Sequence, residues 1–101
     1  MRHEKNRDTL IVYLSGELDH CNAQGIRREM DALLSDVRIR KMIIDMQEMT
    51  FMDSSGIGVI LGRYRQMAAR GGSVAVRRMN RHVSRIFTLS GMGQIIEVMP
   101  E

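Results

Sequence analysis

Residues 52–58, Met-Asp-Ser-Ser-Gly-Ile-Gly, place two hydroxyl side chains and one carboxylate between an apolar run and apolar residues at helical spacing. This pattern predicts that a strand ends and a helix begins here. Either Asp53 or Ser54 should cap that helix, which leaves the hydroxyl of Ser55 free in the first turn. Because the first N–H groups and the dipole of a helix stabilise a phosphate, Ser55 is well placed to be a phosphorylated serine.

Catalysis by this segment is not favoured by the surrounding residues. A nucleophile elbow needs glycine two residues before the serine, where this chain has Asp53. No P-loop is present, because no Gly-Lys-Ser/Thr follows an earlier glycine. The histidines His3, His20 and His82 are scattered, and the sequence gives no reason to place one beside Ser55. We therefore predict no catalytic residue and no enzymatic activity.

Three glycines in and after this segment call for an explanation, because each costs a helix about 0.5–1 kcal/mol relative to alanine. They are Gly56, Gly58 and Gly62. Close packing of the helix on a sheet would explain Gly58 and Gly62, which are four residues apart. Alternatively, the glycines keep the helix start bare, so that another molecule can approach Ser55.

A second polar segment, Ser15–Asn22, follows another apolar run and contains Asp19, His20 and Cys21. It reads as a strand exit followed by a helix cap supplied by Asp19 or Asn22. In a parallel sheet the loops after the strands gather at one edge, so we expect this loop beside Asp53–Gly56. Together the two loops would form a compact recognition surface. Cys21 reads as an ordinary thiol, since no neighbouring motif would activate it.

The elements needed to position these loops alternate along the chain. Apolar runs predict strands at 9–14, 42–46, 74–76 and 95–98, with a further possible edge strand in 1–8. Apolar residues at helical spacing predict helices after Asn22, after Asp53 and after Asn80, the last two ended by Gly71 and Gly91. Strands separated by helices indicate an α/β fold with a largely parallel sheet.

The composition fits one ordinary domain spanning residues 1–101, with 44% hydrophobic and 27% charged residues. A single cysteine excludes an internal disulfide and a four-cysteine zinc site. The charged N-terminus does not read as a secretory signal, and no apolar run approaches the ~20 residues that span a bilayer. We expect a cytoplasmic protein without a metal or cofactor.

Charge divides the chain in two. Residues 1–53 carry eight basic and ten acidic side chains, whereas residues 54–101 carry seven and two, and no acid lies between Ser54 and Ile96. The basic residues of the second half are all arginine: Arg63, Arg65, Arg70, Arg77, Arg78, Arg81 and Arg85. A solvated face is the simplest interpretation. Nucleic acid binding would require interleaved aromatic residues or a helix-turn-helix pattern, and neither is present. An acidic protein partner fits equally well.

Three segments resemble the anti-sigma factor antagonists, which are single STAS domains, over essentially the whole chain. They are Ser15–His20, Phe51–Tyr64 and Leu89–Gly91. The middle segment resembles the sporulation, sigma-F type in particular. Cys21 and Asn22 depart from the family, which usually has His and Thr there. The resemblance implies an α/β STAS fold: a mixed four- to five-stranded sheet with about three to four helices packed mostly on one face.

The resemblance also implies a phosphorylation switch on Ser55. The partners it implies are an anti-sigma factor that is itself an ATP-dependent serine kinase, with ADP or ATP bound, and a PP2C-type phosphatase. Direct contact with nucleic acid or membrane is not expected. The predicted partner-binding residues are Asp19, His20, Asp53, Ser54, Gly56 and Ile57. Three alternatives remain: a STAS module acting on a different serine kinase, a small nucleotide-binding or hydrolytic domain, and a nucleic-acid-binding module built on the arginines.

Overall fold

The computed structural model describes residues 1–100. In chain order its elements are β1 (Arg2–Asn6), β2 (Thr9–Leu18), α1 (Ala23–Leu33), β3 (Lys41–Met52), α2 (Ser54–Ala69), β4 (Ser73–Arg77), α3 (Arg81–Leu89), the 3₁₀ turn η1 (Met92–Gln94) and β5 (Glu97–Val98). The predicted alternation of strands and helices is confirmed. The possible edge strand in residues 1–8 is also present, as β1.

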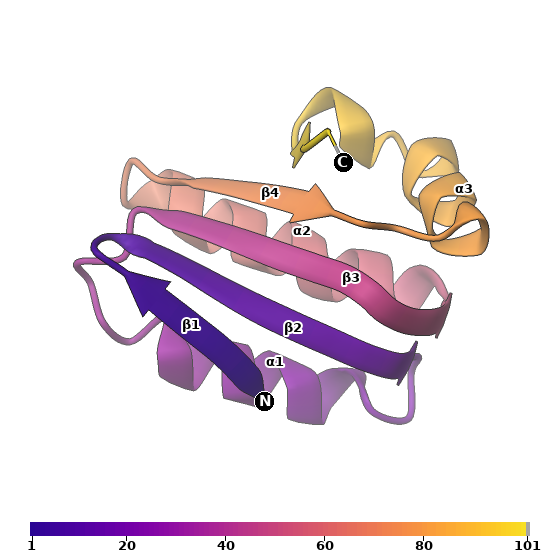
Figure 1. Ribbon diagram of the computed structural model, residues 1–101, viewed down its shortest axis with the longest axis horizontal. Helices are drawn as coiled ribbons and strands as arrows, with labels where there is room; N and C mark the ends of the chain where they lie inside the picture. The colour runs from indigo at the N-terminus through magenta and orange to yellow at the C-terminus, as the bar shows by residue number, and fades with distance from the viewer. Residues whose placement is uncertain (101) are drawn as a thin grey trace.

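The five strands form one sheet in the order β1-β2-β3-β4-β5 (Figure 1). β1 runs antiparallel to β2, whereas β2, β3, β4 and β5 are mutually parallel. A hairpin turn suffices for the antiparallel pair, while each parallel pair needs a crossover connection. The mixed sheet predicted from the resemblance is confirmed.

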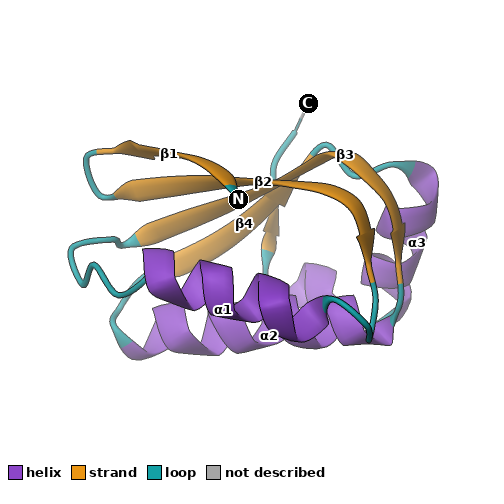
Figure 2. Ribbon diagram, turned by 90° about the horizontal axis from the view of Figure 1, so that it is seen from below, coloured by secondary structure: helices purple, strands orange, loops and turns teal. Residues whose placement is uncertain are grey.

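Helices α1 and α2 lie side by side on one face of the sheet, and α3 lies near one end of it (Figure 2). Alternate strand residues face these helices and are fully buried, which accounts for the apolar runs in the sequence. In β3 these residues are Met42, Ile44 and Met46. The helices contribute Met30 from α1, Ile60 from α2 and Phe87 from α3. The core therefore lies between the sheet and one helical layer.

β3 is much longer than the predicted strand 42–46 and runs on to Met52. The extension was not predicted because Gln47, Glu48 and Thr50 interrupt the apolar pattern. These side chains are exposed, because the second half of β3 pairs with β2 but not with the shorter β4. A register shift between β2 and β3 marks the start of this half. The extension carries the chain out to the start of α2.

The last predicted strand, 95–98, is shorter than expected. Only Glu97 and Val98 pair with β4, and the 3₁₀ turn Met92–Gln94 precedes them. Ile96 is buried even though it lies outside the strand. Of the apolar run, only Ile96 is buried, while Ile95 and Val98 are about half exposed, so the run does not form a regular buried strand.

The interpretation of the second-half arginines as one solvated face is wrong for Arg63, Arg70 and Arg77, whereas the other four are exposed. Arg63 is buried between α2 and α1, with its Nε 3.3 Å from Asp31 Oδ1. Burial lowers the pKa of Arg63, Asp31 acts to raise it, and Arg27 lowers it further. Arg70 donates to backbone carbonyls at the end of α1, including Leu34 O at 2.8 Å. These arginines hold elements together instead of coating a surface.

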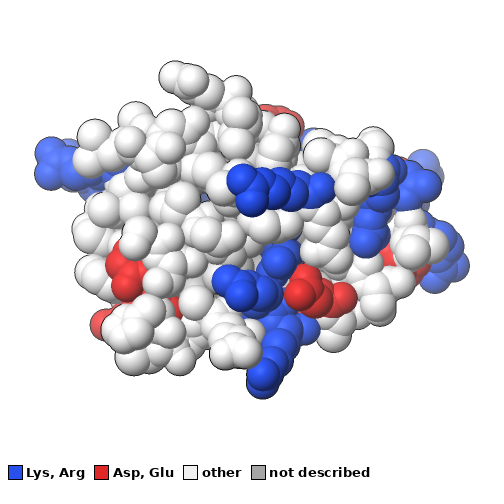
Figure 3. All heavy atoms as spheres, turned by 180° about the vertical axis from the view of Figure 1, so that it is seen from behind, with Lys and Arg blue, Asp and Glu red and all other residues white. Residues whose placement is uncertain are grey.

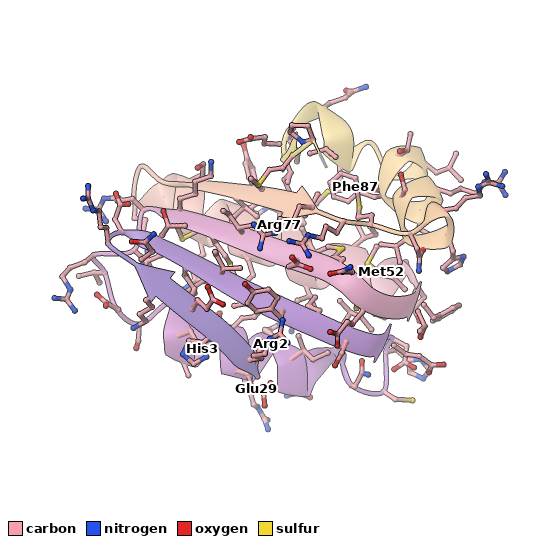
Figure 4. The ribbon with its side chains drawn as sticks, viewed as in Figure 1. Arg2, His3, Glu29, Met52, Arg77 and Phe87 are labelled. Atoms are coloured by element: carbon pink, nitrogen blue, oxygen red, sulfur yellow. The ribbon has the colours of Figure 1, made fainter. Side chains whose placement is uncertain are left out.

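Two further arginines bind one carboxylate on the sheet face that α1 and α2 leave uncovered. Asp45 is 2% exposed, and its Oδ2 lies 2.8 Å from Arg77 Nε and 3.4 Å from Arg78 Nε. Figure 4 shows the Arg77 side chain extending from β4 over β3. Burial acts to raise the pKa of Asp45, but the Gln47 N–H, the Arg77 hydrogen bond and the two arginine charges outweigh it. The pKa therefore lies below its usual value.

We expect Asp45→Asn to lower the free energy of unfolding by about 1–3 kcal/mol at neutral pH, because it leaves a half-buried guanidinium without its counter-charge. Since folding lowers the pKa of Asp45, its contribution is present above the ordinary value of 3.8 and is lost as pH falls through the folded-state pKa. Urea unfolding of both proteins at decreasing pH measures the difference. The difference in the free energy of unfolding should become smaller as the pH falls. A difference that does not change with pH would contradict the role given to the Asp45 carboxylate.

Candidate functional site

The two polar segments identified in the sequence meet at the carboxyl edge of the sheet, but the first is shorter than predicted. Ser15–Leu18 extend β2 by pairing with β3, so only residues 19–22 form the loop. β2 and β3 are paired in parallel up to their last residues, Leu18 opposite Met52. Beyond that pair, the Asp53 N–H donates to Leu18 O at 3.3 Å. Figure 4 labels Met52 at the end of β3, where the end of β2 lies beside it. The predicted juxtaposition is therefore confirmed. We call this surface, formed by residues 19–22 and 53–58, the docking edge.

Asp53 is the N-cap of α2, which settles the choice between Asp53 and Ser54. Its backbone is extended, with φ −111° and ψ −170°, and its Oδ1 accepts the Ser55 N–H at 2.8 Å. The Asp53 carbonyl accepts the N–H of Gly56 at 3.0 Å and that of Ile57 at 3.4 Å. These bonds fix the carboxylate over the first turn of the helix.

The two serines differ in exposure. Ser54 is exposed and Ser55 is half-buried, and neither hydroxyl hydrogen-bonds to any of residues 1–100. No side chain among those residues is bonded to Ser55 Oγ as a general base would be. The Ser55 hydroxyl is thus unbonded within residues 1–100, and no side chain of those residues is positioned to activate it. The arrangement is therefore not that of a catalytic serine with a base bonded to it.

Gly56 is the position where α2 approaches the strand ends. It is buried, and a Cβ there would overlap Met52 Cγ and lie 2.8 Å from Met52 Sδ and 3.0 Å from Leu18 Cγ. Only glycine allows this approach without movement of its neighbours. Gly56 therefore sets the position of the helix start. Ile57, the next residue, is half-buried and packs against the core.

Close packing does not explain the other two glycines, so that interpretation is wrong for Gly58 and Gly62. A Cβ at either position would meet nothing within 4 Å. Gly58 is exposed, one turn from Ser54 and Ser55 on the outer side of α2. The alternative, a helix surface left bare for an approaching molecule, remains a prediction.

The first loop is held rigid by a reciprocal pair of bonds. Asp19 Oδ1 accepts the N–H groups of Cys21 at 2.9 Å and Asn22 at 3.2 Å, while Asn22 Oδ1 accepts the Asp19 N–H at 2.9 Å. Asn22 stands at the formal N-cap of α1, but its side chain makes no cap bond to the helix. Asp19 closes the preceding turn, as one of the two predicted cap residues. Its carboxylate is consequently held in place at the docking edge.

His20 and Cys21 are exposed at the tip of this loop, with Cys21 Sγ 3.7 Å from His20 Nε2. Their side chains make no other hydrogen bond within residues 1–100. His20 is therefore exposed to solvent, and its predicted contact with a partner stays a prediction. Across the same residues, no three His, Cys, Asp or Glu side chains gather as metal ligands would. No helix there has the length and apolar character that crossing a bilayer requires.

Two residues beside the docking edge, Phe51 and His82, were not predicted from the sequence to lie there. Phe51 is 40% exposed, and its ring stacks on that of His82 with centroids 5.1 Å apart. His82 Nε2 also lies 3.3 Å from Met52 O. Asn80, which caps α3, donates to Met49 O at 2.8 Å. The free carbonyls of the extended β3 thus hold the start of α3 against the edge. In the sequence, the only indication of this contact is an aromatic residue two positions before Asp53.

Comparison with known proteins places this arrangement in a family. The STAS domain model matches residues 1–101. The anti-sigma F factor antagonist of Paenibacillus polymyxa is 40% identical over 94% of this chain and 81% of its own length. That of Lysinibacillus sphaericus is 33% identical over 86% and 74%. The anti-sigma-B factor antagonist of Bacillus subtilis is 26% identical over 94% and 85%.

Solved structures agree with the sequence matches. The unphosphorylated form of the anti-sigma factor antagonist SpoIIAA superposes with a TM-score of 0.84 at 31% identity, covering 99% of this chain and 88% of that one. The phosphorylated form of the Bacillus protein SpoIIAA gives 0.76 at 30% identity, with 99% and 91% covered. By sequence and by fold, this chain belongs to the STAS domain family, among the anti-sigma factor antagonists.

Proposed function

We propose that this chain is a phosphorylation-controlled anti-sigma factor antagonist of the sporulation sigma-F type. Its unphosphorylated form binds an anti-sigma factor that is also a serine kinase, and the sigma factor is released. Phosphorylation of Ser55 by the same kinase ends that binding. The observation that carries the proposal is the free Ser55 hydroxyl, held beside the capping carboxylate of Asp53 at the docking edge.

In the phosphorylation step the γ-phosphoryl group of ATP moves to the serine. A bond forms between the γ-phosphorus and Ser55 Oγ, the bond to the β,γ-bridging oxygen breaks, and ADP leaves with that oxygen. The hydroxyl proton passes to a base on the kinase, because none of residues 1–100 holds a base against Ser55 Oγ. The antagonist is thus substrate and binding partner, not an enzyme. It carries no cofactor of its own, and the ATP or ADP is bound to the kinase.

Electrostatics explains how the phosphate would prevent docking. A phosphoserine carries about −1.5 to −2 charges at pH 7. The Asp53 carboxylate already accepts the Ser55 N–H, so the phosphate adds negative charge beside an existing one. Asp19, fixed in the neighbouring loop, adds a second. A partner surface that fits the unmodified edge would meet new bulk and charge that it does not match. No refolding of the chain is needed.

The contact surface proposed for the kinase combines Asp19 and His20 with Asp53, Ser54 and Ile57. Gly56 is buried and acts through the position of α2 rather than by contact. A PP2C-type phosphatase would restore the free hydroxyl by hydrolysing the phosphoserine. We place all these partners in the cytoplasm. We also propose that residues 1–101 form a single STAS domain.

The main alternative is an antagonist acting on another serine kinase. It is favoured by the 26% identity to the anti-sigma-B factor antagonist of Bacillus subtilis, which has a different sigma factor in its name. Nucleotide hydrolysis and nucleic acid binding are weaker candidates. The two lysines, Lys5 and Lys41, lie where β2 and β3 begin, whereas α2 starts where β3 ends, so neither lysine is placed to cradle a phosphate there.

The proposal is tested by competition. The purified chain is titrated into a preformed complex of the anti-sigma kinase, ADP and sigma F, and release of the sigma factor is followed by fluorescence anisotropy. Sigma F should be displaced in proportion to the antagonist added. The same titration with the kinase of the sigma-B system distinguishes a sigma-F type antagonist from an antagonist that acts on another serine kinase. Displacement only there would favour the alternative, and displacement in neither system would overturn both.

A further inference from the structure

Helix α3 carries an exposed stripe that the proposed function does not use. Arg81, Arg85 and Leu89 follow at intervals of four residues, so they lie along one side of the helix. All three are exposed, and Leu89 is 79% exposed. Neither guanidinium forms a hydrogen bond or salt bridge with the part of the chain that the structure describes, in contrast to the partnered Arg63, Arg70, Arg77 and Arg78.

This stripe is unfavourable for the helix that carries it. The positive end of the helix dipole lies at the N-terminus, yet α3 begins with Arg81 and has no acidic residue in its first turn. Arg85 follows four residues later, and like charges at that spacing repel each other. Two local rules are therefore broken without a compensating contact in the described structure. Such conflicts are expected where a surface serves binding.

The stripe is continuous with the docking edge. His82, in the same first turn as Arg81, stacks on Phe51 with ring centroids 5.1 Å apart and lies 3.3 Å from Met52 O. Phe51 is two residues before Asp53, the cap over Ser55. In Figure 3 the margin at the level of α3 carries Lys and Arg atoms, with Asp and Glu atoms below them. The exposed Phe51 ring therefore joins the first turn of α3, which carries Arg81, to the start of α2, which Asp53 caps.

We infer that Arg81 and Arg85, with Phe51 and Leu89, form the second half of the docking edge and receive an acidic patch with an apolar centre on the anti-sigma kinase. This inference rests on the proposed function. Basic groups of the same partner would face Asp19 and Asp53. The opposed charges fix the rotation of the partner on the edge and speed its association.

The test is a charge reversal, Arg81→Glu with Arg85→Glu, measured by surface plasmon resonance against the immobilised kinase with ADP. The matched control is Arg7→Glu with Arg28→Glu, which changes net charge equally at two exposed residues outside the docking edge and α3. We expect about tenfold or greater loss of affinity for the first variant, mainly through slower association, and about twofold or less for the control. Raising the salt concentration should narrow the difference.

Circular dichroism and urea unfolding show that each variant is folded, and Arg81→Gln with Arg85→Gln should give a smaller loss in the same direction. If the charge-reversal variant and the control variant lose equal affinity for the kinase, the effect is due to net charge and the inference is overturned. Unchanged affinity would also overturn it while leaving the proposed function intact. A random-sequence oligonucleotide bound by the unsubstituted chain and released by the reversal would assign the stripe to nucleic acid instead. No binding of the unsubstituted chain to the kinase would remove the proposed function and the inference together.

Discussion

Ser55→Asp should bind the ADP-bound anti-sigma kinase about 100-fold more weakly than the unsubstituted chain, whereas Ser55→Ala should bind it normally. An added carboxylate next to Asp53 leaves an unmatched charge in the contact, which typically costs 2–5 kcal/mol at an interface. About 2.7 kcal/mol corresponds to two orders of magnitude in affinity. Isothermal titration calorimetry of the three proteins measures the difference.

The neighbouring serine supplies the control. Ser54 lies on the same helix turn but is exposed, and its hydroxyl is equally unpartnered within residues 1–100. Ser54→Ala should still be phosphorylated, because it leaves the Ser55 hydroxyl in place. Normal binding by Ser55→Asp would contradict the electrostatic explanation of the switch.

The second large effect concerns the glycines of α2. Gly56→Ala should lower the free energy of unfolding by about 1–3 kcal/mol, because its methyl group overlaps Met52 and crowds Leu18. Gly58→Ala should raise it by about 0.5–1 kcal/mol, since alanine favours the helix and the space is open. Urea unfolding of both variants measures whether the free energy of unfolding falls for Gly56→Ala and rises for Gly58→Ala. A stable Gly56→Ala would show that the strand ends yield more easily than the contacts indicate.

Binding separates stability from the role of the bare surface. Gly58→Ala should weaken the kinase complex although the variant is more stable, because its methyl group lies on the side that a partner approaches. Gly62→Ala, one turn farther from Ser55 and equally open, should gain stability without losing affinity. Equal affinities for the two alanine variants would show that Gly58 is not required for docking.

The docking edge could be predicted because its determinants are local or follow from strand order. A helix cap is predicted by the residue types of Asp53, Ser54 and Ser55 alone. Parallel pairing then brings the ends of β2 and β3 to one edge of the sheet. The same local logic located the strands around Ile11 and Ile44. The second half of β3 was not predicted, because its polar side chains face solvent. β4 pairs only with the first half of β3, so the second half has β2 as its one neighbouring strand.

What could not be predicted depends on contacts between residues distant in sequence. Asp45 and Arg77 are 32 residues apart, and nothing near either one indicates the ion pair. His82 looked like an isolated surface residue until the fold placed it 3.3 Å from Met52 O. The cost of Gly58 in a helix was evident, but a glycine pattern does not distinguish a packed neighbour from open space. Three-dimensional neighbours decided each case.

The central claim is that Ser55 is the switch. Incubating the unsubstituted chain with the anti-sigma kinase and ATP, followed by peptide mass spectrometry with fragmentation between residues 54 and 55, tests it most directly. We predict one phosphate per chain, on Ser55, and none on Ser55→Ala under the same conditions. Phosphate on Ser54, or undiminished phosphorylation of Ser55→Ala, would contradict the account.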